Sequence, residues 1–190
     1  MNDITAKIIG CAIEECLILV DNSNIFIEGM KFSARRKGIQ GTPEQPAPCD
    51  YAWRIDFGAL LKQVTNGHRI IKAILVGSTP LPNDSLWNAA KLQGFEVITY
   101  ERSILGGEKA VDTELVARGL KVIYKHPAPA VLKLLSGDRD FIPLLKAAYE
   151  ENWETELWGF SDSISPELSM MANRTYTLDA VFDQIGKYTV

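Results

Sequence analysis

The chain has 190 residues, of which 46% are hydrophobic and 23% charged, enough apolar material for one domain with a substantial core. Its net charge of −4 argues against a generally basic nucleic-acid coat protein, and its 2 histidines argue against a histidine-built zinc site. No uncharged stretch approaches the roughly 20 apolar residues of a membrane-spanning helix. No basic segment precedes the apolar run 8–13, so no signal peptide is expected.

The three cysteines are odd in number and lack C-x-x-C spacing, which favours reduced thiols in a cytoplasmic protein. We therefore expect a cytoplasmic location and no membrane partner.

Short apolar runs alternate with amphipathic segments along the chain. Several of the apolar runs are almost continuous, as in parallel strands that are covered on both faces. This alternation indicates βαβ crossovers, and hence an α/β fold with a mainly parallel central sheet. In chain order the pattern predicts strand 16–20, helix 25–36, helix 56–66, strand 70–76, helix 85–93, strand 96–100, helix 112–125, strand 131–135, helix 141–151, strand 154–160, helix 166–172, an extended piece 175–178 and helix 180–187.

A proline-rich segment, 38–51, interrupts this alternation. It is too long for an ordinary connection within a βα unit, so we interpret it as a surface loop. Two interpretations remain open for it, namely a tolerated insertion and a substrate lid near the site. The rest of the chain shows no repeat and no linker, and we expect a single domain over 1–190 with its core at 16–188.

Four aspartates fall where ligands bind in open α/β sheets, outside the carboxyl ends of the strands. Asp21 follows the first strand directly, and Asp138 and Asp140 follow strand 131–135. Asp112 opens the predicted helix that leads back to that strand. Taken singly, Asp112 and Asp140 are each explained by a helix N-cap, whereas Asp21 ends a run of apolar residues without an evident structural purpose.

Together these carboxylates predict a metal site. Carboxylates packed closely repel one another, which raises the pKa of some of them unless a cation is present. Proteins tolerate such clusters mainly where a hard, oxygen-preferring ion such as Mg²⁺ or Mn²⁺ binds. A site of acids without histidine points to phosphoryl transfer rather than to zinc hydrolysis.

Competing motifs are incomplete. The string Gly106-Gly-Glu-Lys109 is not a P-loop, because Ala110 stands where a Ser or Thr must follow the lysine. The chain contains neither a G-x-G-x-x-G fingerprint nor a G-x-S-x-G nucleophile elbow. Haloacid-type phosphatases place a second aspartate two residues after the first, and Ser23 stands there.

Three strings resemble a known family, the NYN domain, which is the LabA-like branch of the PIN-like nucleases. They are Leu17-Ile-Leu-Val-Asp-Asn-Ser-Asn24, Lys109-Ala-Val-Asp112 and Ser136-Gly-Asp-Arg-Asp-Phe-Ile-Pro-Leu144. The resemblance extends from about residue 16 to the last predicted helix. It implies a three-layer αβα sandwich of PIN-like type and metal-dependent ribonuclease activity.

The family pattern implies roles for individual residues. Asp21, Asp112, Asp138 and Asp140 match the catalytic, metal-binding carboxylates. The family lysine before the aspartate and a later S-x-x-L element are matched as well, whereas Asn173-Arg174 stands where an acidic residue often follows. The residues expected to contact the ion or the substrate are Asn24, Lys109, Ser136, Arg139 and Ser165. A plain solvated charge is the alternative interpretation of Lys109 and Arg139, and the favoured one for Arg139.

The expected activity is hydrolysis of RNA phosphodiester bonds by a water that Mg²⁺ or Mn²⁺ activates. RNA, single-stranded or structured, is the expected partner, and homo-oligomers or protein partners remain open. The basic run 35–37, with Lys31, is interpreted either as a track for the RNA backbone or as a solvated helix end.

Two alternatives to the ribonuclease remain. One is an inactive, regulatory PIN-like module that binds RNA or protein without cleaving. The other is a metal-dependent adhesion module, because Asp21-Asn-Ser23 begins like the D-x-S-x-S motif, although Ile25 lacks its last ligand.

Overall fold

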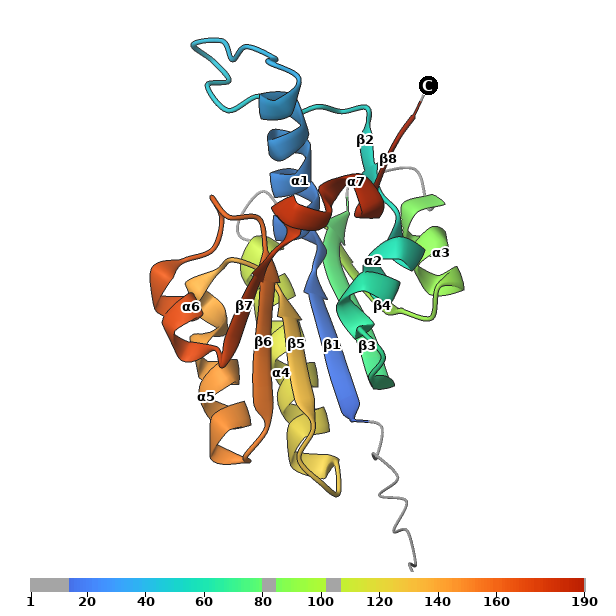
Figure 1. The fold of residues 1–190 in the computed structure, drawn as a ribbon, viewed down its shortest axis with the longest axis vertical. Coiled ribbons are helices and arrows are strands. Elements are labelled where there is room, and N and C mark those ends of the chain that lie inside the picture. The colour runs from blue at the N-terminus through green and yellow to red at the C-terminus, as the bar shows by residue number, and fades with distance from the viewer. Residues whose placement is uncertain (1–13, 80–84, 102–106, 190) are drawn as a thin grey trace, which may run out of the picture.

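The computed structural model describes residues 14–79, 85–101 and 107–189, so the apolar run 8–13 lies outside the described residues. Its centre is a six-stranded sheet in the order β4-β3-β1-β5-β6-β7 (Figure 1). Every neighbouring pair of strands is parallel. The strands are β1 (Glu15–Asp21), β3 (Arg69–Thr79), β4 (Glu96–Glu101), β5 (Val131–Leu135), β6 (Glu154–Gly159) and β7 (Arg174–Thr177).

The apolar run of β1 explains its central position. Every residue from Cys16 to Val20 is fully buried, and β1 pairs with β3 on one side and β5 on the other. Cys16, Ile18 and Val20 face one hydrophobic cluster, while Leu17 and Leu19 face the other. A strand covered on both faces needs apolar residues at every position, which is why the pattern is continuous.

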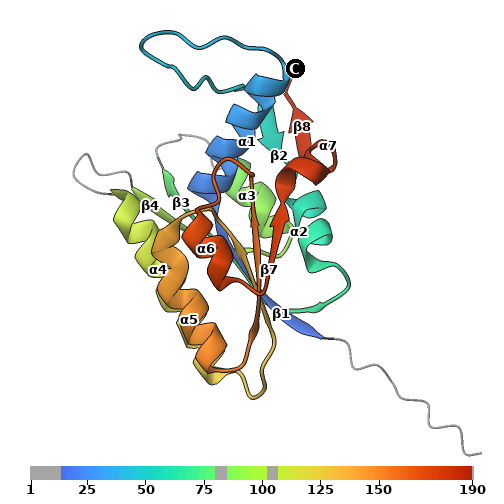
Figure 2. The same ribbon diagram turned by 60° about the vertical axis from the view of Figure 1, so that its left-hand side comes forward.

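Helices form a layer on each face of the sheet, as Figures 1 and 2 show. One face is covered by α4 (Gly107–Lys125), α5 (Ile142–Glu150) and α6 (Pro166–Met171). The other is covered by α1 (Asn22–Arg36), α2 (Phe57–Thr65), α3 (Ser85–Leu92) and α7 (Phe182–Ile185). This arrangement confirms the α/β fold class and the three-layer αβα sandwich, and all five predicted strands are present in it.

The C-terminal segment differs from the sequence-based expectation of one helix over 180–187. A 3₁₀ turn (Leu178–Val181) and the short α7 are followed by β8 (Gly186–Tyr188), which pairs antiparallel with β2 (Trp53–Ile55). Helix α7 ends at Ile185, and Gly186 is extended. The backbone at Gly186 packs directly on Trp53, whose Nε1 would lie 2.2 Å from a Cβ at that position. Strand β2 was not predicted, because three residues are too few to show a periodic pattern.

Helix α4 begins at Gly107, five residues earlier than predicted. Asp112 therefore lies inside the helix, so the interpretation of Asp112 as its N-cap is wrong. The N-cap explanation of Asp140 also fails, because Phe141 occupies the N-cap position of α5 and Asp140 lies in a preceding 3₁₀ turn, Arg139–Phe141. The aspartate thought to lack a structural purpose, Asp21, is instead the N-cap of α1.

The proline-rich loop leaves the C-terminal end of α1 and projects away from the sheet (Figure 1). Helix α1 has 15 residues, so the start of the loop and Asp21 are separated by about 22 Å of helix rise. This separation favours a tolerated insertion over a lid.

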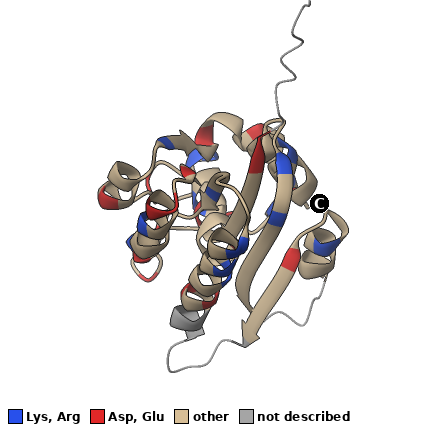
Figure 3. Ribbon diagram, turned by 90° about the horizontal axis from the view of Figure 1, so that it is seen from below, with Lys and Arg blue, Asp and Glu red and all other residues tan. Residues whose placement is uncertain are grey.

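Charges of both signs are interspersed among the described residues at the end where the strands begin (Figure 3). No helix of the described part is long and apolar enough to cross a membrane.

Candidate metal centre

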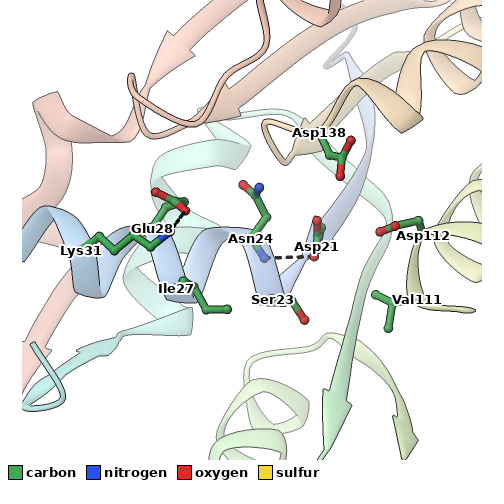
Figure 4. Close-up of a pocket in the computed structure, with 9 residues that line it drawn as sticks. All are labelled: Asp21, Ser23, Asn24, Ile27, Glu28, Lys31, Val111, Asp112 and Asp138. Atoms are coloured by element: carbon green, nitrogen blue, oxygen red, sulfur yellow. Dashed lines mark hydrogen bonds and ion pairs between the residues drawn. The ribbon is translucent and has the colours of Figure 1, made fainter. Parts of the chain in front are cut away.

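The acidic residues meet at the carboxyl edge of the sheet because of the strand register. Asp21 is the last residue of β1, and Val20 beside it pairs with Leu135, the last residue of β5. The segment that follows β5 therefore passes next to Asp21. Helix α4 packs against β1 and β3 and brings Asp112 to the same edge (Figure 4).

Three carboxylates form the cluster. One oxygen from each of Asp112, Asp138 and Asp140 lies within 4.8 Å of the others. Two oxygens that bind one divalent ion at 2.0 to 2.6 Å are separated by about 5 Å at most. The spacing of the three oxygens therefore fits a common cation, and the donor set is purely oxygen, which suits Mg²⁺ or Mn²⁺.

Asp21 lies beside this cluster rather than inside it. Its side chain lines the same pocket as Asp112 and Asp138, and only 4% of the residue is exposed. Burial, which disfavours the charged form, raises the pKa of Asp21 from 3.8 to about 6, and the charge of Asp138 acts in the same direction. The hydrogen bonds from Asn24 and Ser136 oppose this shift without cancelling it.

Ser136 connects Asp21 with the segment that carries Asp138. Its hydroxyl donates to Asp21 Oδ2 at 3.0 Å and accepts from the backbone N–H of Asp138 at 3.2 Å. Asn24 Oδ1 accepts from the backbone N–H of Gly137 at 3.1 Å, which adds a second connection between α1 and the segment after β5. Because Ser136 is fully buried, this hydroxyl positions two carboxylates and does not reach a substrate.

The backbone at Gly137 is held tightly from the other side. A Cβ at Gly137 would lie 2.0 Å from the carbonyl oxygen of Ser163, so this position requires glycine. The backbone N–H of Ser165 donates to the carbonyl of Gly137 at 2.9 Å. Ser165 Oγ in turn accepts from Leu168 N and caps α6. Ser165 thus supports the loop that carries Asp138 and does not line the pocket.

The remaining predicted contacts are more distant or undescribed. Arg139 is exposed in the 3₁₀ turn and does not line the pocket. Lys109 lies in α4, but its side chain is outside the described part of the structure. Asn24 lines the pocket, with its amide oxygen engaged by Gly137. Its NH₂ group remains as the donor that it can offer to a phosphate oxygen.

The pocket itself has a volume of about 230 Å³ and continues from Asp21 along α1 (Figure 4). Its α1 side includes Ile27, Glu28 and Lys31, and Val111 lies on the opposite side. The sequence analysis did not single out Ile27 or Glu28 as site residues. Their spacing of three and four residues from Asn24 is the signal that could have identified them, because such residues share one helix face.

The model of the NYN domain family matches residues 17–179, from β1 through the last 3₁₀ turn. The chain belongs to the NYN domain family. NYN domains are part of the PIN-like nuclease superfamily, so the fold is of nuclease type.

A solved structure supports the fold of this NYN domain. The crystal structure of a protein of unknown function from Vibrio parahaemolyticus is similar to it with a TM-score of 0.65. The similarity covers 92% of this chain and 96% of that one at 17% sequence identity, which bears on the fold alone. No curated protein matches the sequence significantly.

The basic run at the end of α1 is engaged in ion pairs with other segments of the NYN domain. Arg35 pairs with Asp162 at 2.8 Å, and Arg36 pairs with Asp183 at 2.7 Å. Lys37 Nζ lies 2.7 Å from an oxygen of Asp50 and 3.9 Å from the centre of the Tyr188 ring. These contacts connect the end of α1 to the segments before β2 and after β6 and to the C-terminal elements α7 and β8, which favours a structural role for the run over an RNA track.

Proposed function

We propose that this NYN domain is a divalent-metal-dependent ribonuclease, which hydrolyses RNA phosphodiester bonds at its aspartate cluster. One observation carries the proposal: three carboxylate oxygens within 4.8 Å of one another stand beside a buried fourth carboxylate at the carboxyl edge of a nuclease-type fold. Ionised carboxylates packed this closely repel one another, and a bound cation offsets that repulsion.

Each residue of the site has a separate role in this proposal. Asp112, Asp138 and Asp140 would hold Mg²⁺ or Mn²⁺. Asp21 adds a fourth carboxylate to the same pocket, and Asn24 offers its amide NH₂ to a non-bridging phosphate oxygen. A bound ion supplies positive charge that stabilises the phosphoryl transition state and makes water nucleophilic at neutral pH.

The buried framework keeps these groups in place. Hydrolysis joins the oxygen of water to phosphorus, breaks one P–O ester bond and leaves a proton on the departing oxygen. Carboxylates on three separate segments must therefore hold their geometry throughout the reaction. The Ser136 hydroxyl and the Asn24–Gly137 hydrogen bond support that geometry, because they join the end of β1 and the start of α1 to the segment after β5.

Cleavage of labelled single-stranded RNA in Mn²⁺ tests the proposal, with Asp138→Asn and Asp140→Asn as variants. Asn also serves as an N-cap, so Asp138→Asn retains an acceptor for the N–H of Asp140 while it removes the charge. We expect both variants to lose cleavage while their circular dichroism spectra match that of the wild type. Glu150→Gln, which removes an exposed charge on α5, is the matched control and should cleave normally.

Wild-type turnover in both aspartate variants would show that the activity comes from another site or from a contaminant. Thermal stabilisation of the wild type by Mn²⁺ without any RNA cleavage would instead favour the inactive, regulatory alternative.

A further inference from the structure

The candidate pocket extends well beyond the carboxylates. Three of its lining residues, Ile27, Glu28 and Lys31, lie on α1 after Asn24 (Figure 4). Lys31 is ten residues from Asp21, which corresponds to about 15 Å of helix rise. The pocket is therefore an elongated groove, with the metal-binding acids at one end and Lys31 at the other.

The charge along this groove is uneven. Among the nine residues that line it, Lys31 is the one cation, while four are carboxylates. Lys31 Nζ lies 2.8 Å from Glu28 Oε1, and the two side chains are 31% and 18% exposed. Ile27, next to this pair, is partly buried against the core and presents apolar surface to the groove.

The Glu28–Lys31 pair differs in kind from the ion pairs of the basic run 35–37. Those pairs join α1 to other segments, so breaking them loosens tertiary contacts. The Glu28–Lys31 pair joins two residues one turn apart on the same helix, a contact that contributes only a few tenths of a kcal/mol. A phosphate can therefore replace Glu28 as the partner of Lys31 without disturbing the fold.

We infer that this groove binds one strand of RNA along α1. Lys31 contacts a backbone phosphate away from the bond that is cleaved, Ile27 packs against a ribose or base, and Glu28 limits affinity by competing for Lys31. A span of about 15 Å corresponds to roughly four nucleotides of a stacked strand at 3.4 Å each. The inference rests on the proposed ribonuclease function, because the acids define where the cleaved bond lies.

The dimensions of the groove favour a single strand over a duplex. The groove follows one helix for about 15 Å and has a volume of about 230 Å³, so it offers one narrow track and not a broad surface. Double-stranded RNA is bound over broad surfaces that span successive grooves of the duplex. A single strand, with its bases unpaired, can place a phosphate at Lys31 and an apolar face on Ile27.

Binding of a fluorescein-labelled 12-nucleotide single-stranded RNA, followed by anisotropy across salt concentrations, tests this groove. Lys31→Met should weaken binding and lower the slope of log K against log salt by about 0.7, the value for one phosphate contact on a single strand. Glu28→Gln should strengthen binding about 2- to 3-fold, because Lys31 is then unopposed. Lys146→Met, which removes an exposed charge on α5, is the matched control and should bind like the wild type.

The opposite signs of the two variants are the decisive result. If the Glu28–Lys31 pair were purely structural, Lys31→Met and Glu28→Gln would change RNA binding in the same direction. This outcome would overturn the inference. Equal binding by both variants and the wild type would overturn it as well. In cleavage assays, Lys31→Met should reduce the advantage in kcat/KM that the 12-mer holds over a dinucleotide.

The binding and cleavage measurements separate the two proposals. If the wild type cleaves RNA and both α1 variants bind RNA as it does, RNA binding in the groove is refuted and the ribonuclease function is not. A wild type that binds the 12-mer with the expected opposite effects but cleaves nothing refutes the ribonuclease function and supports the groove. A wild type that neither binds nor cleaves refutes both.

Discussion

Replacing Asp21 by asparagine should stabilise the metal-free protein at neutral pH. Burial raises the pKa of Asp21 to about 6, so the folded chain prefers the neutral carboxyl group. The stability that Asp21 contributes is complete below its unfolded pKa near 3.8 and is lost as pH rises through about 6. The whole shift corresponds to about 3 kcal/mol, of which about half is lost between pH 5 and pH 8.

The substitution has a smaller unfavourable effect at Ser136. The oxygen of asparagine can still accept the N–H of Asn24, so the cap of α1 is retained. Its NH₂ group, however, would face a hydroxyl that donates to Asp21 Oδ2 in the wild type. Loss of that hydrogen bond costs about 1 kcal/mol. We therefore expect a net stabilisation of about 2 kcal/mol at pH 8 and of less than about 1 kcal/mol at pH 5.

Thermal melts in a chelator at both pH values measure this effect. At pH 8 the variant should melt about 4–8 °C above the wild type, given the size of the chain. Added Mn²⁺ should stabilise the wild type by mass action and the variant much less. Asp56→Asn is the matched control, because Asp56 caps α2 in the same way but its side chain is 43% exposed.

Two results together would refute the reasoning. They are a variant that is less stable than the wild type at pH 8 in chelator, and a wild type that does not respond to Mn²⁺. Asp21 would then be only the N-cap of α1, and the case for a metal site at this edge would fail with it.

Three further predictions follow from packing and charge. Gly137→Ala should destabilise the protein by about 1–3 kcal/mol and weaken its thermal response to Mn²⁺, because the new Cβ meets the carbonyl oxygen of Ser163; melts with and without Mn²⁺ measure both effects, and a normal Mn²⁺ response would argue against the site. Lys133→Met should cost about 3 kcal/mol in urea denaturation, because Lys133 is fully buried and its buried partner Glu156 would keep only the half-exposed Arg174, at 3.5 Å, as an ion-pair partner; the double variant with Glu156→Gln should recover part of this loss, and an equal or larger loss would contradict the explanation. Neutralising the run 35–37 should lower the melting temperature and leave the RNA affinity nearly unchanged, because its charges pair with other segments. An unchanged melting temperature with much weaker RNA binding would instead show that the run binds the RNA backbone.

Local pattern was enough to predict the central sheet. The run from Cys16 to Val20 is apolar at every position because β1 is covered on both faces. Strand β5 is also buried at all five positions, but its pattern is interrupted by Lys133, which pairs with Glu156. Helix starts were less predictable. Helix α4 begins at Gly107, where neighbouring glycines in the sequence resemble a loop, and the helix as a whole packs against β1, β3 and α5, which no local pattern reveals.

The capping roles show a clearer limit of sequence reasoning. Asp21 was thought to lack a structural role and proved to be an N-cap, whereas Asp112 and Asp140 were explained as caps and are not. A capping hydrogen bond depends on which residue has non-helical backbone angles, and a boundary error of a few residues reassigns it. Aspartate was correctly recognised as a capping residue type, but the residue that occupies each N-cap position was predicted wrongly.

The sequence by itself determined which segments become strands and which acids follow them, because both depend on neighbours within a few residues. Only the tertiary structure decided how the acids meet. The hydrogen bond from Ser136 to Asp21 spans 115 positions, and the one from Gly137 to Asn24 spans 113. The pairing of β2 with β8 likewise joins distant segments. Such contacts follow from the parallel register of β1 and β5 and from the packing of α1 and α4, which no local pattern specifies.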